Sequence, residues 1–97
     1  KSGNETYRIN KKEILFIKSE GNYAKIVLLN KSILTLSNMS SILKKINEEK
    51  FIQVNRSYII NISKITKIET HQITIDNYKI PIGVSYRKEV LKKIIKL

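Results

Sequence analysis

The sequence predicts one mostly β domain, built from antiparallel sheets and hairpins and completed by two short helices. Runs rich in β-branched and aromatic residues alternate with turn residues along most of the chain, and apolar residues take helical spacing only twice. The length of 97 residues, 41% of them hydrophobic, suits one core and not two. Residues 1–97 are therefore expected to form a single domain, with residues 1–9 as the remnant of a linker.

The first half of the chain predicts three antiparallel strands. Residues 13–18 read EILFIK, and similar runs return at residues 24–29 and 32–36. Glu20-Gly21-Asn22 breaks the first run with turn chemistry. Asn30-Lys31 separates the second run from the third, and because asparagine tolerates positive φ, we expect a tight hairpin there.

The first helix is predicted where the apolar spacing changes. Four apolar residues stand at offsets 0, 3, 4 and 7, which mark one face of an α-helix: Met39, Ile42, Leu43 and Ile46. Ser37 or Asn38 can cap this helix, because a short side-chain oxygen accepts from an otherwise unpaired backbone N–H. Core packing is the expected role of this helix.

The second half predicts five more strands and the second helix. The strands are expected at residues 51–54, 58–62, 66–70, 73–76 and 79–82. His71-Gln72 is expected in a hairpin loop, and Asn77-Tyr78 is expected to turn the chain into the last strand. Pro81 cannot donate a ladder hydrogen bond, so that strand lies at a sheet edge or ends there. Ser85 is expected to cap a terminal helix over residues 86–96.

The charge balance indicates a polyanionic partner. Nineteen lysines and arginines stand against eight acidic residues, which gives a formal net charge of +11. Such a field raises the local concentration of polyanions and their rate of association. A lysine-rich, solvated surface without a partner is the competing interpretation.

Several function classes are excluded by the composition. The chain has no cysteine, and its single histidine, His71, excludes a multi-histidine metal site. No nucleophile elbow and no phosphate-binding glycine loop occur. We therefore expect no enzymatic activity, no catalytic residue, no cofactor, no metal and no small-molecule substrate. The apolar runs are far shorter than the ~20 residues of a membrane-spanning helix, so no membrane partner is expected.

The first candidate binding loop lies between the first two strands. It offers Asn22, Tyr23 and Lys25 as side chains able to contact nucleic acid, with Tyr23 expected to lie half in the core. A plain hairpin turn, in which Gly21 and Asn22 supply the geometry, is the competing interpretation.

The second candidate loop is Asn55-Arg56-Ser57, between two apolar runs. A buried and unpaired guanidinium is costly, so the strand is expected to end near Asn55 with Arg56 pointing outward. Arginine occurs only three times in the chain, and its planar fork can bond bidentately to guanine or to phosphate. The alternative is a structural arginine paired with Glu20 or Glu69.

The third candidate loop opens the last helix with Ser85, Arg87 and Lys88. Phosphate groups can use such a cluster, although a solvated helix face also accounts for it.

Three blocks of the sequence resemble one known family. Residues 51–61, FIQVNRSYIIN, resemble the central signature of LytTR-type DNA-binding domains. Residues 14–17 and 20–23 are similar to that family's opening strand and loop, and Ile80-Pro81-Ile82 followed by Tyr86 is similar to its ending. The resemblance covers roughly residues 10–95, with the blocks in the family's order.

The resemblance implies a mostly β domain, unlike a helix-turn-helix domain, whose loops enter successive major grooves. Carried over by position, the DNA contacts would come from residues 22–25, Asn55-Arg56 and residues 85–87. Asn55 stands where the family often has histidine, so base preference there is expected to differ. Gly83-Val84 stand where the family often has serine and a basic residue.

The expected function is sequence-specific binding of double-stranded DNA by a bacterial transcriptional regulator. The resemblance implies the effector domain of a two-component response regulator, in the cytoplasm, whose receiver or sensor domain lies outside this chain. Arg56 and Arg87 are expected to read bases, and a second set is expected to hold phosphates: Asn22, Lys25, Ser57 and Lys88. Such domains would bind repeated half-sites in promoters as a homodimer.

Two alternatives remain open at the level of the sequence. An RNA-binding or single-strand-binding module would need an aromatic platform on a sheet face. A charge-driven domain would dock an acidic protein or an anionic membrane surface without any preference for a DNA sequence.

Overall fold

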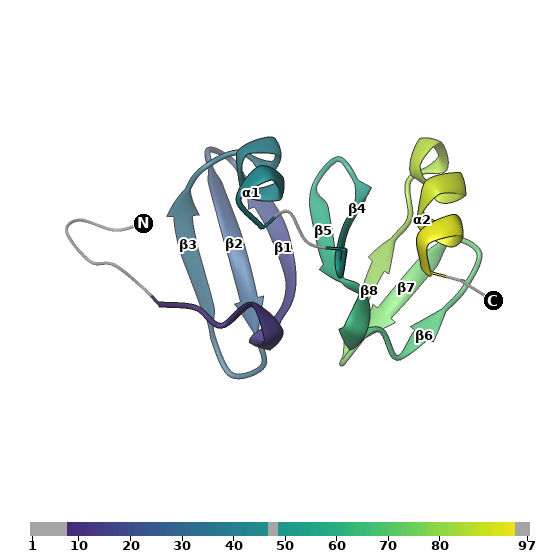
Figure 1. The fold of residues 1–97 in the computed structure, drawn as a ribbon, viewed down its shortest axis with the longest axis horizontal. Coiled ribbons are helices and arrows are strands. Elements are labelled where there is room, and N and C mark those ends of the chain that lie inside the picture. The colour runs from purple at the N-terminus through teal and green to yellow at the C-terminus, as the bar shows by residue number, and fades with distance from the viewer. Residues whose placement is uncertain (1–7, 47–48, 95–97) are drawn as a thin grey trace.

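The computed structural model describes residues 8–46 and 49–94 (Figure 1). Helices and strands follow in the order β1 Ile14–Glu20, β2 Tyr23–Leu28, β3 Ser32–Leu36, α1 Met39–Ile46, β4 Phe51–Asn55, β5 Tyr58–Asn61, β6 Lys67–Ile68, β7 Gln72–Ile75, β8 Tyr78–Pro81 and α2 Arg87–Ile94. Short 3-10 turns lie at Lys11–Glu13, Ile62–Lys64 and Val84–Tyr86. Of the expected linker at residues 1–9, residues 1–7 lie outside the described residues.

The strands form two antiparallel sheets. The five-stranded sheet has the order β3-β2-β1-β5-β4, and the three-stranded sheet has the order β6-β7-β8. α1 lies beside the larger sheet and α2 beside the smaller one (Figure 1), and five strands separate the two helices along the chain. The predicted mostly β fold with two short helices is therefore confirmed, and its helices do not form a helix-turn-helix pair.

One face of the larger sheet packs against α1. Ile17 and Ile59, from the paired strands β1 and β5, share a buried cluster with Met39 and Ile42 of α1. Asn38 Oδ1 accepts from the N–H of Ser41 at 2.8 Å and so caps this helix. The predicted helix and one of its two candidate caps are confirmed.

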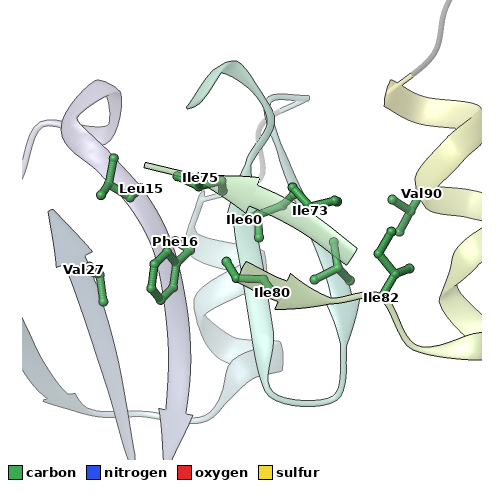
Figure 2. Close-up of a cluster of buried hydrophobic side chains, with 10 residues drawn as sticks. Leu15, Phe16, Val27, Ile60, Ile73, Ile75, Ile80, Ile82 and Val90 are labelled. Atoms are coloured by element: carbon green, nitrogen blue, oxygen red, sulfur yellow. The ribbon is translucent and has the colours of Figure 1, made fainter. Parts of the chain in front are cut away.

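The opposite face of the larger sheet packs against the smaller sheet and α2. Phe16 and Ile60 lie in a buried cluster with Ile73, Ile80 and Val90 (Figure 2). β1 and β5 are therefore covered on both faces near their centres. This explains why their sequences read as continuous apolar runs and not as an alternating pattern.

Asn61 is the buried polar residue at the end of β5, with 1% of its surface exposed. Its Nδ2 donates to the Ile14 carbonyl at 2.8 Å, and its Oδ1 accepts from the Ser63 N–H at 3.0 Å and from the Ser63 hydroxyl at 2.7 Å. Because a buried amide without partners is costly, these bonds fix how the chain leaves β5 beside the start of β1.

Two turns of the smaller sheet differ from the sequence-based prediction. The predicted strand over residues 66–70 is too long, because the Glu69 N–H donates to the Gln72 carbonyl at 2.9 Å and closes the turn earlier. The next turn lies one residue before the predicted Asn77-Tyr78. Asp76 takes the left-handed conformation there, with φ of 54°, and Tyr78 already pairs with Ile75.

The entry into α2 also differs from the prediction, because Ser85 does not cap the helix. A 3-10 turn over Val84–Tyr86 starts at Gly83 without a side-chain cap, and α2 begins only at Arg87. The Tyr86 N–H donates to the Gly83 carbonyl at 2.9 Å and sets this tighter turn. Residues 95–96 of the predicted helix lie outside the described residues.

The expectation for Pro81 is confirmed. It ends β8, which is an edge strand of the smaller sheet. Among residues 8–46 and 49–94, no helix is long and apolar enough to cross a membrane.

Asn61→Ala is expected to lower the free energy of unfolding by about 1–3 kcal/mol, because it leaves the buried Ile14 carbonyl without its donor. Urea denaturation measures this change. Asn30→Ala is the control, since Asn30 is exposed in the β2–β3 turn. Equal stability losses in the two variants would contradict the structural role of the Asn61 amide.

Candidate nucleic-acid interface

Three connections of the chain lie at the same end of the molecule. They are the β1–β2 turn at Gly21-Asn22, the β4–β5 turn at Arg56-Ser57, and residues 83–86 between β8 and α2 (Figure 1). Antiparallel pairing of β1 with β5 brings the first two turns together, because the end of β1 lies beside the start of β5.

Backbone hydrogen bonds join these connections to one another. The Ser19 N–H donates to the Ser57 carbonyl at 2.8 Å, just before the β1–β2 turn. The Gly83 N–H donates to the Val54 carbonyl at 2.8 Å, just before the β4–β5 turn. The β4–β5 turn thus lies between the other two connections, and backbone hydrogen bonds next to it join it to both.

The β1–β2 turn is a tight hairpin with polar residues at its tip. Gly21 has φ of +60°, a conformation that glycine adopts without strain, and Asn22 is exposed. Tyr23 is 43% exposed, so its side chain is partly covered by the protein and partly open to solvent, in keeping with the expectation that it lies half in the core. It begins β2 on the face that α1 does not cover. Lys25 Nζ lies 3.9 Å from a carboxylate oxygen of Glu20, and both side chains are partly exposed.

Arg56 points outward from the β4–β5 turn, as the sequence predicts. β4 ends at Asn55, and Arg56 is exposed. Its backbone carbonyl accepts from Gln53 Nε2 at 3.4 Å. Across residues 8–46 and 49–94, its guanidinium has no hydrogen bond or ion pair, which leaves the planar fork available to a ligand.

The two acids proposed as structural partners of Arg56 have other neighbours. Glu20 pairs with Lys25. Glu69 accepts from Gln72 Nε2 at 2.8 Å, and this hydrogen bond, together with the charges of Lys67 and Lys79, lowers the pKa of the Glu69 carboxyl. The interpretation of Arg56 as a structural arginine therefore finds no partner among the described residues.

Both polar atoms of the Asn55 side-chain amide form hydrogen bonds within the protein. Its Oδ1 accepts from the Ser57 N–H at 2.8 Å, and its Nδ2 donates to the Pro81 carbonyl at 2.7 Å. The first bond shapes the turn that carries Arg56, and the second ties this turn to the end of β8. Sequence reasoning missed the second bond, because Pro81 is 26 positions away in the chain.

The candidate residues of the third loop differ in their exposure to solvent and in their partners. Ser85 and Lys88 are exposed. Arg87 is half-buried, and its Nη2 lies 2.7 Å from Nδ1 of His71 in the β6–β7 turn, while its Nε is buried without a partner among the described residues. The Arg87 guanidinium is thus held within the chain, unlike that of Arg56.

Gly83 and Val84 were not predicted as site residues. A Cβ on Gly83 would lie 2.9 Å from Tyr86 Cδ1 and 3.4 Å from Asn55 Cβ, so a side chain at this crossing of the two sheets would require the Tyr86 ring to shift. Val84 is 83% exposed at the tip of the third loop. The sequence offered one signal for these two residues, namely that they stand where the family often has serine and a basic residue.

No group of three or more histidine or acidic side chains in the described parts of the chain is arranged to bind a metal ion. The interface consists instead of polar, basic and aliphatic side chains on loops held by a rigid sheet. These features define a β-sheet domain with three adjacent, largely polar loops at one end.

Comparison with known proteins identifies the family. The chain matches the sequence model of the LytTr DNA-binding domain over residues 4–95 and belongs to that family. The suspected LytTR resemblance is therefore confirmed, and the chain is a DNA-binding domain.

Two known proteins are similar to this chain. The sensory transduction protein LytT of Bacillus subtilis is 28% identical over 93 residues, which cover 90% of this chain. The match spans 38% of the length of that protein. A solved structure of the LytTr DNA-binding domain of a putative methyl-accepting/DNA response regulator from Bacillus cereus has the same fold, with a TM-score of 0.82 at 15% identity. It covers 97% of this chain and 92% of the other.

Gly83→Ala is expected to destabilise the domain by about 1–3 kcal/mol, because the added methyl group overlaps the Tyr86 ring. Urea denaturation of Gly83→Ala, Tyr86→Ala and the double variant measures the coupling. The cost of Gly83→Ala should fall when the ring is absent. An unchanged cost would show that the ring is not what excludes a side chain at this position.

Proposed function

We propose that this domain binds double-stranded DNA in a sequence-specific manner, as the effector domain of a bacterial transcriptional regulator. The observation that carries the proposal is the exposed, unpaired Arg56 in the middle of three adjacent loops. A guanidinium at such a place can reach base edges in the major groove, while neighbouring side chains contact the phosphates of the flanking DNA backbone.

Arg56 is proposed to read guanine. Its planar fork matches the O6 and N7 acceptors of guanine, whereas a lysine would offer only a point charge. The Gln53 amide and the Asn55 side chain restrict the turn that carries it. A restricted turn loses little freedom on binding, and this favours discrimination between bases.

The surrounding polar side chains are proposed to contact phosphates and set the register. The set comprises Asn22, Tyr23, Lys25, Ser57, Ser85 and Lys88. Val84 is proposed to add an apolar contact, of the kind that the methyl group of thymine accepts.

Asn55 and Arg87 are proposed to act mainly as positioning residues. Their polar groups already bond to Pro81 and to His71. Direct base reading by either would compete with these internal bonds. The sequence-based proposal that Arg87 reads bases is therefore weaker than the one for Arg56.

At the level of the regulator, we propose that the loops enter successive major grooves at repeated promoter half-sites and that two copies bind as a homodimer. A receiver domain of a two-component system would then control this effector in the cytoplasm, without any catalytic role for the domain. The name of the Bacillus subtilis relative, a sensory transduction protein, supports this reading.

Selection from a pool of random duplex DNA at moderate salt tests the proposed function. A repeated motif with fixed spacing is expected to be enriched. Enrichment of no sequence, with binding lost uniformly as salt rises, would contradict sequence-specific recognition and favour a purely electrostatic domain.

Arg56→Ala is expected to cost about 1–3 kcal/mol of binding free energy on the selected duplex and much less on random duplex DNA. Electrophoretic mobility shift at fixed salt measures both values. Lys45→Ala is the matched control, because Lys45 is an exposed cation of α1 outside the three loops. Equal losses for Arg56→Ala on both duplexes would contradict base reading.

A further inference from the structure

A groove of about 350 Å³ lies on the larger sheet at the border with the smaller one. Residues of β1, β2, β3, β5 and β8 and of the β2–β3 turn line it. Lys18 pairs across strands with Lys25 on one side and with Tyr58 on the other. Cross-strand partners share a face, and neighbouring Ile17 faces α1. The groove therefore lies on the face opposite α1.

The groove has an apolar floor and exposed apolar borders. Phe16 and Val27, which line it, are only 3% and 5% exposed. Leu29 and Tyr78, which also line it, are 67% and 43% exposed. Large apolar side chains left in water beside a concave apolar floor are typical of a surface that binds another protein.

The charged residues that line this groove are all lysines. They are Lys18, Lys25 and Lys31. Lys25 has a partner in Glu20 at 3.9 Å, but both side chains are about two-fifths exposed, so this pair is weak and easily exchanged. Lys18 Nζ lies 5.9 Å from the centre of the Tyr58 ring. The groove thus combines apolar contact area with positive charge.

We propose that this groove binds an acidic segment of a protein partner that carries apolar side chains between its carboxylates. Carboxylates would pair with the three lysines, and the apolar side chains would cover Leu29 and Tyr78. Lys25 belongs both to this groove and to the residues proposed to contact phosphates, whereas Lys18 and Lys31 belong to the groove alone. The proposal therefore does not depend on the DNA-binding role of the three loops.

Charge and ring geometry disfavour two other occupants. A second copy that presented the same face would place its own three lysines against these three, so two such faces would repel each other. Single-stranded nucleic acid prefers rings arranged as a stacking platform. Here the Tyr78 and Tyr58 rings meet the Phe16 ring at 73° and 45°, with centroids 4.8 and 5.7 Å apart.

Fluorescence anisotropy with two labelled peptides tests the proposal. The probe consists of three Glu-Leu-Asp-Phe repeats, and the control peptide has serine in place of each leucine and phenylalanine, with the same charge. The probe is expected to bind about tenfold more tightly than the control. Equal affinity of the two peptides would overturn the proposal, because attraction by charge alone would explain it.

Two charge-reversal variants test whether the probe peptide binds in this groove. Lys31→Glu is expected to weaken probe binding about tenfold, whereas Lys44→Glu, on the exposed side of α1, changes the net charge equally and should have little effect. Equal weakening by both variants would overturn the assignment to this groove. Displacement of the probe by an equimolar thymidine oligonucleotide would overturn the choice of a protein partner.

Discussion

The approach of Gly83 to the end of β4 is the contact on which the candidate interface depends. At this point the Gly83 N–H bonds to the Val54 carbonyl, and the missing side chain lets the backbone lie against Asn55. The Asn55 amide then bridges to the Pro81 carbonyl. Because these bonds cross between the two sheets, they fix the third loop relative to the turn that carries Arg56. Apolar side chains from both sheets also pack together in one buried cluster next to this crossing.

This arrangement divides the polar residues of the loops into two groups. Asn55 and Arg87 have internal partners, which restrict the backbone around them. Arg56 has no side-chain partner among the described residues, and Asn22 is exposed at the neighbouring tip. Sequence-specific recognition needs both kinds of residue. A side chain with free hydrogen-bond donors discriminates between ligands only when the backbone that carries it is held in place by residues with internal partners. Because the chain belongs to the LytTr DNA-binding domain family, DNA is the ligand that these residues are proposed to contact.

Local sequence patterns predicted the parts of the fold that local forces control. The helical spacing from Met39 to Ile46, the cap at Asn38 and the end of β4 before Arg56 all follow from such patterns. Contacts between distant residues were not predictable. The bond from Asn55 to Pro81 spans 26 positions, and that from Arg87 to His71 spans 16. Ser85 failed as a cap for the same reason, because the crossing at Gly83 dictates the tighter turn before α2.

The claim that three adjacent loops form the DNA-binding surface is tested most directly by NMR. A ¹⁵N-labelled domain would be titrated with a duplex that carries its selected site, and amide shifts would be followed residue by residue. The largest changes are expected in the turns at Gly21-Asn22 and Arg56-Ser57 and in residues 83–86, with little change in the β2–β3 turn at the other end of the sheet. Changes centred on α1 or on the β2–β3 turn, with none at Arg56, would contradict it.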